Sequence, residues 1–148
     1  MNLESKINDA LKAAIKQQDA VALRSLRAIK SEILLVKTSG KGGEVTPADE
    51  IALLQKMIKQ RKESLAIFQK EGRADLQKKE QEEIDIIQKF LPEQLSSSEL
   101  ENIINTVLSE TGASGIKDMG KVMGAATKII AGRAENQVVA QLIKSKLG

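Results

Sequence analysis

A glycine-containing helical segment with lysines on one side is the strongest candidate for chemistry in this sequence. Gly120 and Gly124 share one face of a helix predicted over about 118–131, and Lys121 and Lys128 lie beside that face. A glycine in a helix interior costs about 1 kcal/mol relative to alanine, so some contact should offset this cost. A bare helix flanked by cations suits a sugar-phosphate strand, through phosphate or shape contacts and not base readout. We therefore predict that RNA contacts a set of five residues on this face and the turn after it: Gly120, Lys121, Gly124, Lys128 and Arg133.

Structural explanations that involve no ligand also apply to this helix. Close packing against a neighbouring helix is the more common reason for glycines with this spacing. The opposite, apolar face of the helix indicates core and not a cofactor site: Met119, Val122, Met123, Ala126, Ile129 and Ile130. Residues 115–122 also imitate the start of a phosphate-binding P-loop, but Val122 stands where that motif needs a hydroxyl and no strand precedes it.

Two further groups of cations recur at helical spacing in the first half of the chain. One group is Arg24, Arg27 and Lys30, and the other is Lys59 and Lys62, with Lys56 before them. Solvated helix faces usually carry such charges. If RNA contacts this half of the chain, these cations form the secondary basic patch that it would meet.

Arg61 differs from the other cations because it falls within the apolar stripe of its helix, between Ile58 and Leu65. Glu80 and Glu83 fall within the apolar stripe of the next helix. A partly buried guanidinium needs an anionic partner, and a carboxylate is the natural one. We interpret Arg61, Glu80 and Glu83 as a structural pairing. A catalytic glutamate with a shifted pKa is the alternative.

The sequence contains no His and no Cys. Nucleophilic catalysis by cysteine or by a serine–histidine pair is therefore excluded, and disulfides are impossible. No side chain has an ordinary pKa near neutrality. We expect no metal, no cofactor and no autonomous catalysis, and we place no residue in a catalytic role.

Apolar periodicity predicts helices throughout the chain and no strands. The expected helices cover, approximately, residues 3–18, 19–37, 47–71, 74–90, 97–110, 118–131 and 136–146. Thr46 followed by Pro47 and Asp49 is a strong helix start, and Ser96 with Glu99 matches a capping box. A flexible loop is expected over 38–43, where three glycines occur.

The predicted fold class is all-α, with about four longer helices bundled in the first part and three short helices in the second. We place an N-terminal domain at 1–91, a linker at 92–97 and a C-terminal domain at 98–148. The first part has 17 basic and 14 acidic residues, whereas residues 92–148 have 6 of each, so any basic surface must be local. The start of the chain lacks the apolar core of a signal peptide and no apolar run is long enough to span a bilayer, so we expect a soluble, cytoplasmic protein.

Several motifs occur together in an order that resembles one known family. They are LRSLR at 23–27, KQRKESL at 59–65, GRADL at 72–76, FLPEQL at 90–95, DMGKVMGA at 118–125 and GRA at 132–134. In this order and spacing they resemble the YqeY family over essentially the whole chain. The family often has Ala-Asp-Gly at the last motif, whereas this chain has Ala134-Glu135-Asn136, with Asn136 as a candidate helix cap.

The resemblance implies a function as well as a fold. The YqeY family shares its helical tail with the B subunit of the tRNA-dependent amidotransferase, in which the tail contacts tRNA while other domains carry out the chemistry. It therefore implies a helical domain followed by a smaller helical tail domain, and an accessory role with tRNA or a tRNA-dependent enzyme. A helical protein–protein adaptor without RNA contact is the alternative. No DNA or membrane partner is expected.

Overall fold

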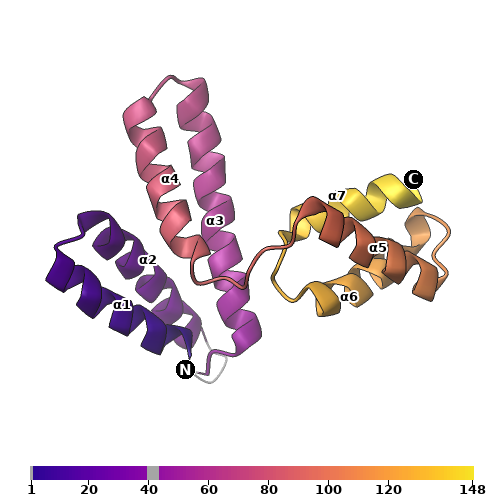
Figure 1. The fold of residues 1–148 in the computed structure, drawn as a ribbon, viewed down its shortest axis with the longest axis horizontal. Helices are drawn as coiled ribbons and strands as arrows, with labels where there is room; N and C mark the ends of the chain where they lie inside the picture. Colours follow the sequence, from indigo (N-terminus) through magenta and orange to yellow (C-terminus); the bar gives the residue numbers. More distant parts are fainter. Residues whose placement is uncertain (1, 40–43) are drawn as a thin grey trace. The chain divides into compact units, whose positions relative to one another are not determined.

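The computed structural model of the chain describes residues 2–39 and 44–148 (Figure 1). Every regular element in these residues is a helix, which confirms the predicted all-α class. The α-helices are α1 (Leu3–Gln17), α2 (Ala20–Lys37), α3 (Pro47–Lys70), α4 (Ala74–Gln88), α5 (Ser97–Thr111), α6 (Met119–Ile130) and α7 (Asn136–Leu147), and a short 3₁₀ turn, η1 (Ile116–Asp118), precedes α6. Residues 40–43 of the predicted loop lie outside the described residues.

Helices α1, α2, α3 and α5 begin where a side chain accepts a hydrogen bond from a free backbone N–H group of the first turn. Thr46 accepts a hydrogen bond from the Asp49 N–H, and the Asp49 side chain accepts one from Thr46 N in return, so the predicted helix start at Thr46 forms a full capping box. At the start of α5, where a capping box was predicted, the Ser96 side chain accepts from the Glu99 N–H. The Glu99 carboxylate accepts from the Ser96 hydroxyl, so only one half of the predicted box forms in the described residues. These local bonds explain why both helix starts could be predicted from sequence.

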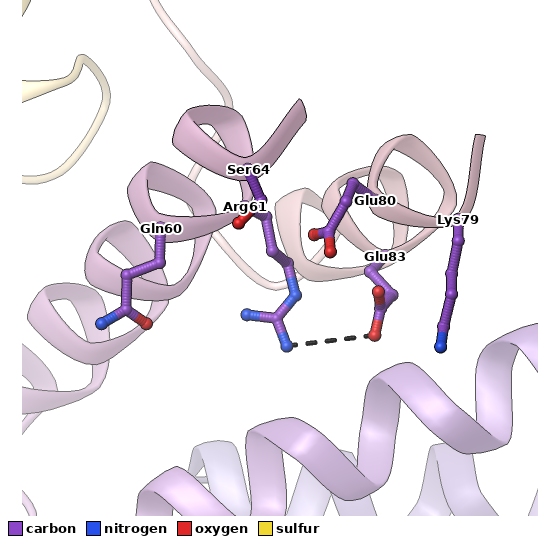
Figure 2. Close-up of a pocket in the computed structure, with 6 residues that line it drawn as sticks. All are labelled: Gln60, Arg61, Ser64, Lys79, Glu80 and Glu83. Carbon is purple, nitrogen blue, oxygen red and sulfur yellow. Dashed lines mark ion pairs between the residues drawn. The ribbon is translucent and has the colours of Figure 1, made fainter. Parts of the chain in front are cut away.

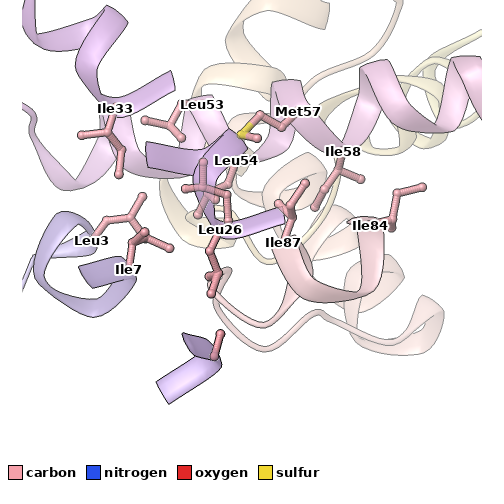
Figure 3. Packing of buried hydrophobic residues seen from close by; sticks show 12 residues of the cluster. Leu3, Ile7, Leu26, Ile33, Leu53, Leu54, Met57, Ile58, Ile84 and Ile87 are labelled. Atoms are coloured by element: carbon pink, nitrogen blue, oxygen red, sulfur yellow. The ribbon is translucent and has the colours of Figure 1, made fainter. Parts of the chain in front are cut away.

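The contacts within the chain divide it into two units, residues 1–91 and 92–148. In the first unit α1 packs against α2 and α3 packs against α4, while α2 also contacts both α3 and α4. Aliphatic side chains and one methionine fill the space between these helices (Figure 3): Leu3, Ile7, Leu26, Ile33, Leu53, Leu54, Met57, Ile58, Ile84 and Ile87. This arrangement fixes α3 and α4 side by side and α2 next to both.

The second unit has a separate core between α5, α6 and α7, which contact one another in all three pairs. The segment before α5 belongs to this unit. Leu95 N donates to the Arg133 carbonyl at 2.8 Å, and Gln94 Nε2 donates to the Gly132 carbonyl at 3.2 Å. The predicted linker at 92–97 is thus hydrogen-bonded to the turn between α6 and α7.

Three residues differ from what the sequence pattern indicates. Ile15 recurs with Leu11 and Ala14 at helical spacing, and Ile129 belongs to the predicted apolar face of the sixth helix, but these two side chains are 59% and 44% exposed. Each lies about 100° around its helix from a buried neighbour, Ala14 and Ile130 respectively, and so falls outside the narrow face that packs. Asn136 is the first residue of α7, and the helix-capping position is Glu135.

Candidate functional site

The two glycines of α6 face open space. Gly120 and Gly124 are both exposed, and a Cβ added at either position would meet no atom within 4 Å. Close helix packing, the commoner explanation of these glycines, is therefore not what the described residues show. No contact among the described residues offsets the cost of Gly124 in the helix interior.

Lys121 extends from this face toward the end of α5. Its Nζ donates a hydrogen bond to the Thr111 carbonyl at 3.2 Å. Thr111 is the last residue of α5, where carbonyls lack helical partners and the helix dipole favours a cation. Lys121 thus joins α5 to α6, although its side chain stays exposed.

Arg133 serves the end of α6 in a similar way. Its Nε donates to the Ile130 carbonyl at 3.0 Å, and its Nη2 donates to the Ile129 carbonyl at 2.8 Å. Lys128 is exposed and forms no hydrogen bond or ion pair within the part of the chain that the structure describes. Of the three predicted RNA-contacting cations, Lys128 is the one without an intramolecular partner.

Not all residues of the predicted secondary basic patch are available at the surface. Arg24 does not stand free beside Arg27, because its guanidinium lies 3.6 Å from a Glu83 oxygen and 3.9 Å from a Glu82 oxygen. Four other members of the patch stay at the surface: Arg27, Lys59 and Lys62 are exposed and Lys30 is half-buried. Arg24 thus connects α2 to α4 and is not part of a surface cation row.

Of the two glutamates predicted to pair with Arg61, Glu83 forms an ion pair with it in the described residues and Glu80 does not (Figure 2). Arg61 Nη2 lies 4.0 Å from Glu83 Oε1, and Arg61 Nη1 donates to the Met57 carbonyl at 3.3 Å. Glu83 is 8% exposed, so it is a buried carboxylate held between Arg24 and Arg61. Glu80 forms no ion pair with any described residue, although its carboxylate lies near the same guanidinium in the close-up.

These side chains line a polar pocket of about 310 Å³ between α3 and α4. Gln60, Arg61 and Ser64 come from α3, and Lys79, Glu80 and Glu83 come from α4. Burial, and next the neighbouring Glu83 carboxylate, raise the pKa of Glu80 above its usual value, against smaller opposing effects of Arg61, Lys79 and Arg24. The sequence interpretation missed Gln60, Ser64 and Lys79. Ser64 lies three residues after Arg61, Lys79 lies four before Glu83, and Gln60 lies four before Ser64, which are the spacings of neighbours on a helix face.

No group of three or more acidic side chains is placed to hold a metal ion in residues 2–39 and 44–148. None of the helices in those ranges is long and apolar enough to cross a membrane. Among the described residues, the open face of α6 and the polar pocket between α3 and α4 are candidate sites.

Comparison with known proteins gives a match over nearly the whole chain. The model of a family described as Yqey-like protein matches residues 4–147. The chain is similar to "Altered inheritance of mitochondria protein 41, mitochondrial" of Pyrenophora tritici-repentis, at 31% identity over 141 residues that cover 93% of this chain and 77% of that protein. It is also similar to "Uncharacterized protein C22F3.15" of Schizosaccharomyces pombe, at 33% identity over 96 residues that cover 65% of this chain and 77% of that protein.

Proposed function

The chain belongs to the YqeY-like protein family, as its motifs predicted, and on this premise we propose that it is an accessory module that binds tRNA without catalysis of its own. One observation carries the proposal: Gly120 and Gly124 leave the backbone of α6 bare, with the unpartnered Lys128 beside them. A phosphate strand can approach such a helix closely and meet a cation there. The resemblance to the amidotransferase tail supports tRNA as the RNA.

The cations on this face have unequal roles in the proposal. Lys128 neutralises a phosphate directly, because it has no hydrogen bond or ion pair to give up among the described residues. Lys121 would first release the Thr111 carbonyl, and Arg133 would release the end of α6. With so few cations the affinity is weak, and log K falls with log salt at a shallow slope, about −0.7 to −0.9 for each phosphate neutralised.

The test is binding of the purified full-length chain to total tRNA at low and at physiological salt. We expect salt-dependent binding that Lys128→Glu weakens severalfold and that the double variant Lys121→Glu, Lys128→Glu weakens further. Lys144→Glu is the matched control, because it makes the same charge change on an exposed position of α7. Equal affinity of the double variant and the unmodified chain would contradict the assignment of RNA to this face.

A protein–protein adaptor is the second candidate, and exposed apolar residues of the second unit favour it. Ile116, Ile129 and Val138 are 49%, 44% and 45% exposed, which leaves apolar area for a partner. Partners that stay bound to the chain after nuclease treatment, together with no tRNA binding at low salt, would select this function. An amide-transferring enzyme is disfavoured by the absence of His and Cys, and glutaminase turnover by the purified chain would reverse that judgement.

A further inference from the structure

We propose that the polar pocket between α3 and α4 binds a small zwitterion of the free amino acid class, with the ligand's ammonium group on Glu80 and its carboxylate on Arg61. The pocket belongs to the first unit, residues 1–91, whereas the proposed RNA face is on α6 of the second. The inference therefore does not depend on tRNA binding.

The two glutamates of the pocket differ in the number of cations within ion-pair distance of their carboxylates. Glu83 lies within ion-pair distance of two guanidinium groups, Arg24 at 3.6 Å and Arg61 at 4.0 Å. Glu80 has no ion pair within the described ranges of the chain, yet it lines the same pocket. The Arg61, Lys79 and Arg24 cations act on Glu80, but burial and Glu83 outweigh them. A partly buried carboxylate without a paired cation favours a charged donor in the space beside it. Glu80 is thus the position for a ligand ammonium.

The opposite side of the pocket carries hydrogen-bond donors. The two Nη atoms of Arg61 have the Met57 carbonyl and Glu83 as partners, whereas its buried Nε has no hydrogen-bond partner among the described residues. The side chains of Ser64 and Gln60 line the same side and make no hydrogen bond with any residue that the structure describes. A guanidinium, a hydroxyl and an amide together form a site for a carboxylate. These groups come from α3, so the ligand would lie across the α3–α4 pair with its two charges toward different helices (Figure 2).

The balance of charge selects a zwitterion over the other small ionic ligands. Arg61 and Lys79 contribute two positive charges to the lining, and Glu80 and Glu83 contribute two negative ones. A phosphate would lie against two carboxylates, and a simple cation would lie against a guanidinium and an ammonium, which are repulsive contacts. A molecule with separated opposite charges meets attraction at both ends.

The size and polarity of the pocket limit the ligand further. Its volume of about 310 Å³ stands at the lower end of small-molecule pockets, which hold roughly 300–1,000 Å³. All six lining residues are polar or charged, so an apolar side chain on the ligand would gain nothing there. Glycine and serine are suitable probes. Because little apolar surface is buried, we expect a dissociation constant on the order of 1 mM.

The ionisation of Glu80 is consistent with this placement. Burial and the Glu83 carboxylate raise the pKa of Glu80, which means that the surroundings of Glu80 in the pocket disfavour its charge. A ligand ammonium would offset both effects and lower that pKa again.

The experiment is a titration of the isotope-labelled full-length chain with glycine and with serine, followed by the backbone amide resonances in NMR spectra. We expect saturable shifts centred on Gln60, Ser64, Glu80 and Glu83. N-acetylglycine, which lacks the ammonium, and glycinamide, which lacks the carboxylate, should each produce at least tenfold weaker binding. No saturable shift up to about 100 mM glycine or serine, a hundredfold above the expected dissociation constant, would overturn the proposal.

Variants separate a specific site from a general ionic effect. Glu80→Gln removes the ammonium partner, keeps the shape and should abolish saturation with glycine. Glu63→Gln is the matched control, because Glu63 is an exposed glutamate of α3 that does not line the pocket. Equal binding of glycine by the Glu80→Gln variant and the unmodified chain would overturn the proposal. So would equal binding of glycine and N-acetylglycine, because it would identify a plain anion site.

Discussion

At the scale of single residues, Glu80 and Glu83 show how position on one helix changes the role of a carboxylate. The two residues are three positions apart on α4, and both face the pocket. Glu83 connects three helices, since Arg24 comes from α2 and Arg61 from α3. Glu80 has no such partner among the described residues, so its charge is a cost to the folded state and not a support.

Replacing Glu83 with glutamine should destabilise the first unit. The variant leaves Arg61 without an ion pair among the described residues and leaves Arg24 with Glu82 alone, at 3.9 Å. A partly buried charge that loses its partner is costly. Removing one partner of a fully buried pair costs about 3–5 kcal/mol, and we expect about 2 kcal/mol here. The lower figure reflects the 34% exposure of the Arg24 side chain. Urea denaturation at neutral pH measures the change, and unaltered stability would show that the two ion pairs are not formed in solution.

Replacing Glu80 with glutamine should instead raise stability at neutral pH. The folded chain raises the pKa of Glu80 above its usual value of 4.5, so protonation of Glu80 favours folding. That contribution is fully present below the unfolded pKa and is lost as the pH rises through the folded pKa. Glutamine is neutral at every pH, so the variant's advantage should be absent near pH 4 and should grow above pH 4.5. Denaturation curves across this range test the sign, and an advantage that shrinks as the pH rises would contradict it.

Ala131 has a backbone conformation that alanine rarely adopts. It ends α6 with φ 47° and ψ 50°, in the left-handed region, and Gly132 follows at φ 83°. Ala131→Gly relieves the clash of the Cβ but adds freedom to the unfolded chain, so we expect a net gain of about 0.5–1 kcal/mol. Ala125→Gly, within the same helix, should lose about 1 kcal/mol in the same thermal denaturation assay. Equal signs for the two substitutions would show that Ala131 is not strained.

At the scale of elements, the sequence predicted most of what depends on local bonds. The starts of α3 and α5 follow from Thr46 and Ser96, whose partners are only three residues away. The pairing of Arg24 with Glu83 could not be predicted, because it joins two helices, α2 and α4, that are far apart in the sequence. The same limit applies to Lys121, whose partner is a backbone carbonyl of α5. Periodicity also placed Ile129 in the core, although the buried face of α6 is too narrow to include it.

The open face of α6 leads to a prediction in which stability and function change in opposite directions. Gly124→Ala should stabilise α6 by up to about 1 kcal/mol, since the added methyl group meets no atom within 4 Å. If tRNA approaches the bare backbone, the same substitution should weaken tRNA binding. Thermal denaturation and tRNA titration of one protein sample measure both effects.

A matched substitution distinguishes backbone approach from simple charge attraction. Lys128→Gln keeps both glycines but removes one cation, and should reduce the slope of log K against log salt by about 0.7–0.9. Gly124→Ala should leave that slope unchanged while lowering the affinity. Full affinity in the Gly124→Ala variant would show that the helix surface itself does not touch RNA.

At the scale of the whole molecule, the two candidate sites belong to separate units with separate cores. Leu91 packs with the core of the first unit, and Leu95 packs with the core of the second. No core side chain is shared between the two clusters. The excess positive charge lies in residues 1–91, whereas residues 92–148 are neutral, so the open face of α6 does not rely on the net charge of its unit.

This division predicts that residues 92–148 fold and bind tRNA alone. The fragment keeps the hydrogen bonds of Gln94 and Leu95 to the turn after α6, and a cut between Leu91 and Pro92 opens neither core. With only 57 residues it should be marginal in stability, as domains of about 60 residues are. Circular dichroism should show a helical spectrum and a cooperative melt, and tRNA affinity should stay within about threefold of the full chain, about 0.7 kcal/mol. A folded fragment that has lost tRNA binding would assign the RNA contact to the cations of the first unit, with Arg27, Lys59 and Lys62 as the residues to reverse next.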